Sequence, residues 1–254
     1  MTRTFADHAC PTSAARLCLI GMWAALALFA PGCYSPPKPL ETYEYLDRYD
    51  RMSDRCEPVL SLVYVAPDAK FADYKAFVVG NVTVGQHWIE NAETARRYAT
   101  LFRNLFYLHL QKKNRFTYVV TDPEFKHTTP MLRLEAKVTI FDSGSAICRF
   151  LTPFYFFLQG AGASDFQLEG RIYDTSTDKV LMEFVDRRRF IGNTPWGPNP
   201  ATLKEDFVMK QTVLATAEAL AVFLDKACEG SLPDLSGEKT DSKAKQNGSR
   251  KQGR

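Results

Sequence analysis

Apolar and polar residues alternate along most of the chain between residues 59 and 227, and the period of this alternation changes from one segment to the next. Two stretches, 91–113 and 201–227, carry apolar residues at helical spacing and predict amphipathic helices. Shorter runs that alternate with period two, or are rich in β-branched and aromatic residues, predict strands at residues 59–65, 75–84, 116–120, 131–141, 164–174 and 179–190. This order of elements predicts one α+β domain, with about six strands in a mostly antiparallel sheet and the two long helices packed on one face.

The pattern also predicts which faces are buried. In the first helix the apolar stripe consists of Tyr98, Leu101, Phe102, Leu105 and Leu108. In the second helix it consists of Phe207, Leu214, Ala217, Ala221 and Leu224. Residues 131–141 alternate most strictly, so Arg133, Glu135, Lys137 and Thr139 are expected on a solvated face of the sheet.

The N-terminus has the pattern of a targeting segment. An uncharged apolar run at residues 17–30 follows Arg3 and Arg16. As a helix these fourteen residues reach about 21 Å, less than the roughly 30 Å of a bilayer's hydrocarbon core. We therefore expect residues 1–32 to be a signal peptide. The alternative, a buried helix of a cytosolic protein, is disfavoured because the run shows no amphipathic period.

The small residues Ala30, Pro31 and Gly32 lie directly before Cys33. This arrangement resembles the lipobox of bacterial lipoproteins, although Ala30 stands where that family prefers Leu. The resemblance implies that Cys33 is lipidated and becomes the first residue of the mature protein, which would anchor it firmly in a membrane. Tyr34, and not Asp, follows the cysteine, which implies the periplasm-facing leaflet of the outer membrane, with the inner membrane as the alternative. An ordinary secretory signal that leaves Cys33 free or disulfide-bonded also remains open.

Composition divides the rest of the chain. Residues 33–58 contain a Pro-rich stretch at 35–39 and are expected to be the lipidated N-terminus and tether. Residues 59–230 are expected to form a single α+β domain, and residues 231–254 a disordered basic tail. The net charge of +3 belongs to this tail, which has six Lys or Arg and three Asp or Glu. The nearly neutral body argues against a nucleic-acid partner.

Candidate chemistry is sparse. Cys56 and Cys228 lie at opposite ends of the predicted domain, and a disulfide between them is a hypothesis that an oxidising compartment permits. The four histidines form no metal-binding motif, and no G-x-S-x-G motif occurs. We therefore predict no catalytic residue, no cofactor and no metal site, and expect that the protein is not an enzyme. The basic run at residues 187–189 is interpreted as a solvated strand end.

The most unusual segment of the body is RFLTPFYFFL at residues 149–158. Two interpretations remain open. It is either part of the core or an exposed apolar docking surface that includes Phe154, Phe156 and Phe157.

The body, from residue 59 to 227, resembles bacterial lipoprotein families of unknown function. The likeness lies in YKAFVVGNVTV before a helix, in LRLEAKVTIFD and in GRIYDTSTDKVLMEFVDRR. It implies a cell-envelope lipoprotein with no family catalytic residues to carry over. We expect a lipid-anchored cell-envelope protein that acts non-enzymatically, as a binding or assembly factor for an envelope protein partner. The alternative is a periplasmic enzyme or small-ligand binder whose site combines residues distant in sequence.

Overall fold

The computed structural model describes residues 45–54, 59–86, 88–122, 124–125, 129–144, 163–190, 193–194, 197–198, 205–233 and 235. Their main helices are α2 (Ala92–Lys113) and α4 (Glu205–Glu229), with short 3-10 helices η2 (Tyr49–Arg51) and η3 (Phe71–Asp73). The strands are β1 (Leu62–Val65), β2 (Ala76–Val84), β3 (Tyr118–Val120), β4 (Met131–Asp142), β5 (Ser164–Asp174), β6 (Lys179–Phe190), β7 (Asn193–Thr194) and β8 (Gly197–Pro198).

Strands β1 to β6 form one sheet in the order β1-β6-β5-β4-β2-β3, while β7 and β8 pair separately. The α+β class, six strands and two long helices agree with the sequence analysis. The expected mostly antiparallel sheet is wrong, because the sheet is mixed: β2 pairs in parallel with both β3 and β4. The physical reason is the crossover through α2, which returns the chain to the end of the sheet where β2 began, so that β3 runs in the same direction.

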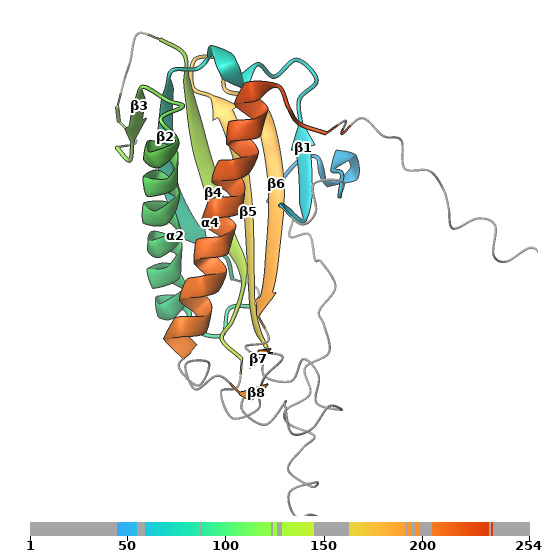
Figure 1. The fold of residues 1–254 in the computed structure, drawn as a ribbon, viewed down its shortest axis with the longest axis vertical. Helices are drawn as coiled ribbons and strands as arrows, with labels where there is room; N and C mark the ends of the chain where they lie inside the picture. The colour runs from blue at the N-terminus through green and yellow to red at the C-terminus, as the bar shows by residue number, and fades with distance from the viewer. Residues whose placement is uncertain are drawn as a thin grey trace, which may run out of the picture.

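Figure 1 shows α2 and α4 side by side in front of the sheet. Their apolar stripes enter one hydrophobic core with alternate strand residues, among them Phe77, Leu134, Leu168 and Phe184. Helix α2 begins at Asn91, whose side chain accepts a hydrogen bond from the backbone N–H of Thr94 at 3.0 Å. This contact satisfies one of the donors that the first turn of a helix leaves unpaired.

One described helix, Asp206–Glu229 within α4, is long and apolar enough to span a membrane. More than half of its most apolar stretch (56%) is buried inside the protein. Met209, Val213 and Leu220 belong to the main core. These contacts make α4 a core helix of this fold.

The face of the sheet opposite the helices, here called the helix-free face, is covered in part by residues 45–54, the N-terminal segment. This segment includes η2 and lies within residues 33–58, the expected lipidated N-terminus and tether. Leu46 and Met52 are buried there against Val185 of β6. Ser53 pairs with Val63 of β1 through two backbone hydrogen bonds of 2.8 and 3.0 Å. The end of the tether region is thus packed on the sheet.

Candidate functional site

Strand alternation places the polar residues of β4 on the helix-free face. Leu132, Leu134, Ala136 and Val138 point into the core under the helices, so the residues between them point the other way. The register with β5 sets Arg133 beside Tyr173, Glu135 beside Arg171 and Lys137 beside Glu169. Oppositely charged side chains therefore face one another across these two strands.

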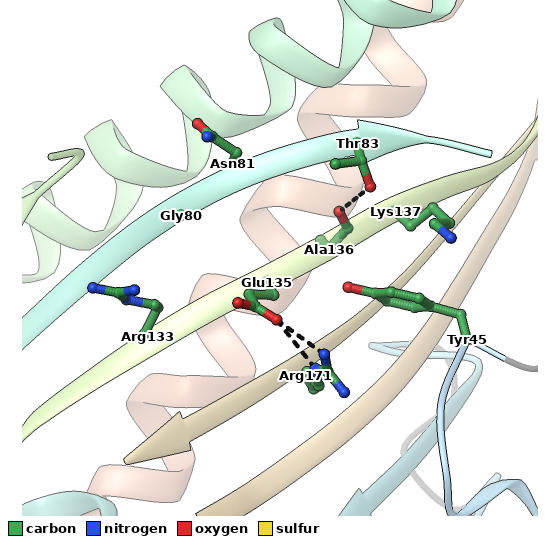
Figure 2. A pocket seen from close by; sticks show the side chains of 9 residues that line it. All are labelled: Tyr45, Gly80, Asn81, Thr83, Arg133, Glu135, Ala136, Lys137 and Arg171. Atoms are coloured by element: carbon green, nitrogen blue, oxygen red, sulfur yellow. Dashed lines mark hydrogen bonds and ion pairs between the residues drawn. The ribbon is translucent and has the colours of Figure 1, made fainter. Parts of the chain in front are cut away.

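A hollow of about 400 Å³ lies on this face where β2, β4 and β5 adjoin the N-terminal segment. Its lining is labelled in Figure 2 and consists of Tyr45, Gly80, Asn81, Thr83, Arg133, Glu135, Ala136, Lys137 and Arg171. A second hollow of about 290 Å³ shares Glu135 and Arg171 and continues toward Tyr173 and Asp178. The two hollows therefore adjoin at Glu135 of β4 and Arg171 of β5.

Gly80 is needed for this geometry. A Cβ atom at this position would lie 2.3 Å from the carbonyl oxygen of Leu134, closer than real Cβ atoms approach. The register between β2 and β4 also shifts between Val79 and Val82, as at a β-bulge. Glycine lets β2 lie close to β4 at this point, and it leaves that part of the floor of the hollow without a side chain.

Glu135 and Arg171 are joined across the hollow, as the dashed lines in Figure 2 mark. The Arg171 guanidinium donates from Nε and Nη2 to one oxygen of Glu135 at 3.2 and 3.1 Å, and the Tyr173 hydroxyl donates to the other at 2.9 Å. Burial is the largest single influence on the pKa of Arg171 and lowers it, but the hydrogen bond to Glu135 and the nearby negative charges together shift it upward. Arg171 therefore stays charged, and both oxygens of Glu135 are engaged.

Tyr45 brings the N-terminal segment into the hollow. Figure 2 shows its ring between Lys137 and Arg171, whose charged groups lie 4.7 and 5.7 Å from the ring centre. These are cation–π distances. Burial is the main cause that raises the pKa of the Tyr45 hydroxyl, so the phenol stays protonated at neutral pH.

Two fully buried carboxylates hold the N-terminal segment beside the hollow. Glu169 accepts hydrogen bonds from Tyr49, from Thr139 at 3.1 Å and from Gln167 at 2.8 Å. Burial raises its pKa, although these hydrogen bonds act in the opposite direction. Glu183 of β6 forms an ion pair with Arg48 at 3.4 Å.

The carboxylates of this face are held by hydrogen bonds from neighbouring side chains. Glu135 and Glu169 are both engaged by hydrogen-bond donors within the face. Within the described part of the chain, no three His, Cys, Asp or Glu side chains are grouped closely enough to hold a metal ion. His109 lies on α2, on the other side of the sheet.

Several sequence-predicted residues lie outside the described residues: Cys33, Cys56, Phe154, Phe156 and Phe157. Their predicted roles in lipidation, disulfide formation and docking stay predictions. Cys228 is described, and it is a free, buried thiol whose Sγ lies 3.6 Å from the Phe71 carbonyl oxygen. Burial raises the pKa of this thiol.

The interpretation of residues 187–189 as a solvated strand end is wrong for its first two members. Arg187 pairs with Asp165, and both side chains are more than nine-tenths buried. Arg188 pairs at 2.9 Å with Asp186, which is buried on the helix side of the sheet. Successive strand residues do point to opposite faces, but each of these two charges meets an acidic partner there.

The hollow itself could not be predicted from the pattern of the sequence. Alternation did place Arg133, Glu135 and Lys137 on one polar face. It gave no sign that Tyr45 would lie among them, because that contact joins segments about ninety residues apart.

Comparisons with known proteins add the following. No curated protein matches the chain in sequence. Among solved structures, the PelC dodecamer from Paraburkholderia phytofirmans is 9% identical, with 62% of this chain and 96% of that chain covered and a TM-score of 0.39. Protein XCC0632 from Xanthomonas campestris is 12% identical, with 66% and 94% covered and a TM-score of 0.41. A candidate lipoprotein from Caulobacter crescentus is 10% identical, with 65% and 96% covered and a TM-score of 0.31.

Such low identities and TM-scores assign no function to this chain. A family model also matches part of the sequence. The matched part includes every residue that lines the main hollow except Tyr45. This match is consistent with the resemblance of residues 59–227 to lipoprotein families of unknown function, because neither family has an assigned activity. Residues 69–193, from just before η3 to the first residue of β7, match the family model described as a domain of unknown function (DUF4410).

Proposed function

We propose that this chain is a lipid-anchored protein of the cell envelope that acts by binding a partner, without catalysis, through the helix-free face of its sheet. Cys33 carries the lipid in this proposal. The outer membrane is the proposed location, because Tyr34 follows Cys33 in the chain. The helices cover one face of the sheet, so the other face is the one that offers polar groups and a hollow to a partner.

The position of Tyr45 is the observation that carries the proposal. Tyr45 lines the hollow, and it lies only twelve residues after Cys33. A fully extended chain of this length spans about 40 Å at most. A lipid on Cys33 would therefore keep the hollow within that distance of the membrane surface.

The anchor is tested by Cys33→Ala in the full chain. We expect the variant to accumulate as an unprocessed precursor without lipid, and globomycin to produce the same precursor from the native chain. Metabolic labelling with a fatty acid, followed by membrane fractionation, measures both effects. Unchanged processing and membrane recovery of the Cys33→Ala chain would rule out the lipid anchor.

The binding face is tested by a photo-activated cross-linking residue placed in the anchored protein. Thr83 on β2 borders the hollow and is exposed, whereas Gln111 on α2 is exposed on the helix side. We expect a reproducible adduct from position 83 in cells and none from position 111. Adducts from position 111 alone would place the binding surface on the helices.

A second candidate function is the binding of a small ligand. The hollow favours it, because its volume lies within the range of small-molecule sites and charged groups converge on it from β4 and β5. The two candidates are compatible, since a ligand can be one part of a larger partner.

A further inference from the structure

The hollow carries a surplus of positive charge. Three basic side chains line it, Arg133, Lys137 and Arg171, against the single carboxylate of Glu135. The lining therefore has a formal charge of plus two near neutral pH. Two further carboxylates act on this lining: Glu169, which has no exposed surface, and the exposed Asp47 of the N-terminal segment, whose charge acts on Arg171. Among the residues that line the hollow, the cations still outnumber the carboxylate.

Lys137 is the cation most available to a ligand. Arg171 is held by Glu135, but Lys137 makes no hydrogen bond or ion pair with another described residue. Its ammonium group lies over the Tyr45 ring, and it is only partly buried. The charge of Lys137 acts on Glu169, its neighbour across the strands, but Glu169 takes its hydrogen bonds from Tyr49, Thr139 and Gln167. The three N–H donors of the ammonium are thus open to a ligand.

Neutral donors border the same space. Asn81 of β2 is exposed at the rim, on the other side of β4 from Arg171, and Thr83 beside it donates its hydroxyl to the Ala136 carbonyl oxygen at 3.4 Å. The Tyr45 hydroxyl, kept protonated by the burial that raises its pKa, points into the hollow in Figure 2. Donors therefore approach from β2, β4, β5 and the N-terminal segment, which suits a tetrahedral anion better than a planar one.

We infer that the hollow binds a phosphate group carried by a larger molecule, with Lys137 as its main charged contact and Arg133 and Arg171 beside it. A dianionic phosphate monoester matches the plus-two charge of the lining, whereas one carboxylate would leave a positive charge uncompensated. The volume of about 400 Å³ leaves room for atoms beyond the phosphate. The tether brings one source of phosphate close, the headgroups of the membrane, and a soluble phosphate ester is the other source.

This inference deepens the proposed function but rests on it only for the nearness of the membrane. Its test uses the mature chain, residues 33–254, with Cys33→Ser to prevent lipidation. This chain retains every residue that the structure describes. Failure of the anchor prediction would leave the result unchanged, so the two proposals fail separately.

Two binding assays distinguish the sources. Isothermal titration calorimetry with glycerol 3-phosphate measures binding of a soluble ester, with acetate and glycerol as comparisons. Co-sedimentation with phosphatidylcholine vesicles, with and without phosphatidic acid, measures binding of a lipid phosphate. We expect binding in at least one assay, weakened by added salt and absent for glycerol. Glycerol 3-phosphate alone would identify a soluble source, and phosphatidic acid alone a lipid source.

Lys137→Met tests the residue, since it keeps an aliphatic side chain beside Tyr45 but removes the charge. We expect about a tenfold loss of affinity, as for one charge-assisted hydrogen bond, and substantial recovery in Lys137→Arg. Lys210→Met is the matched control, because Lys210 is exposed on α4, away from the hollow. Unfolding curves show that each variant is folded.

Three results would overturn the inference. They are no binding in either assay, binding that Lys137→Met leaves unchanged, and acetate binding as tightly as the phosphate ester. The last result would assign the hollow to carboxylates.

Discussion

Glu169 is the residue on the helix-free face whose burial has the clearest consequence for stability. Its carboxyl group has no exposed surface, and burial raises its pKa above the ordinary value of 4.5. As the pH rises, the Glu169 carboxyl group therefore loses its proton at a lower pH in the unfolded chain than in the native chain. The native state then binds more protons than the unfolded state, so the unfolding free energy falls as pH rises through the native pKa.

Glu169→Gln removes this titration. We expect the unfolding free energy of the variant to fall less than that of the native chain between about pH 4.5 and pH 7. Urea unfolding at a series of pH values measures the two slopes. Glu93→Gln, an exposed change in the first turn of α2, is the control. Parallel slopes for the native chain and Glu169→Gln would show that Glu169 does not titrate in this range.

A second prediction for a single residue concerns the effect of Gly80→Ala on stability. Gly80→Ala places a methyl group 2.3 Å from the Leu134 carbonyl oxygen, so β2 and β4 must separate. We expect a loss of about 1 to 3 kcal/mol of stability, as for an overpacked core. Chemical denaturation measures the loss, and the exposed neighbour change Asn81→Ala should alter stability by less than about 0.5 kcal/mol. Equal effects of the two changes would contradict the close approach.

At the scale of one element, the hydrophobic pattern of α2 predicts the bounds of the helix better than its buried side. The predicted span 91–113 agrees closely with the helix Ala92–Lys113 and its Asn91 cap. The predicted stripe is only partly buried: Tyr98 and Phe102 are in the core, but Leu108 is 56% exposed. The buried stripe continues instead through Phe106 and Leu110. The helix has apolar residues on more than one side, so its own sequence does not decide which side meets the sheet.

Two changes on α2 test this orientation. Phe106→Ala removes a fully buried ring that lies 5.8 Å from the Phe77 ring, and we expect a loss of about 3 to 5 kcal/mol. Leu108→Ala removes an exposed side chain and should cost less than about 0.5 kcal/mol. Denaturant unfolding of both variants gives the comparison. A larger loss for Leu108→Ala would mean that the opposite side of α2 is buried.

At the scale of the whole molecule, the two faces of the sheet differ in how firmly they are covered. The helices share one large hydrophobic cluster with the sheet. The N-terminal segment shares only a small separate cluster, formed by Leu46, Met52 and Val185 with their neighbours. A small cluster and a few polar contacts permit local opening without global unfolding.

Native-state hydrogen exchange should therefore separate the two faces. We expect the amide of Ser53, bonded to Val63, to exchange much faster than that of Leu134 at the centre of the sheet. Exchange measured by NMR at several denaturant concentrations distinguishes local from global opening. Equal protection of the two amides, with the same denaturant dependence, would show that the N-terminal segment unfolds only with the core.

The order of the strands in the sheet also explains why the candidate site could not be predicted from the sequence. Strand alternation at residues 131–141 placed Arg133, Glu135 and Lys137 on one face, as observed. The hollow further requires the neighbours of β4, which are β2 on one side and β5 on the other. β5 follows in sequence as an antiparallel partner, but β2 precedes β4 by some fifty residues and pairs with it in parallel. The alternation of polar and apolar residues within a strand does not indicate which distant strand pairs with it in parallel.

The sequence by itself determined the number of main strands and helices, most of their bounds and the polar face of β4, because backbone period depends on neighbours a few residues apart. Only the tertiary structure decided that the sheet is mixed and that Tyr45 lies between Lys137 and Arg171. It also decided that Arg187 and Arg188 are paired and not solvated. These features depend on contacts between distant segments, whose energies come from burial and charge pairing in three dimensions.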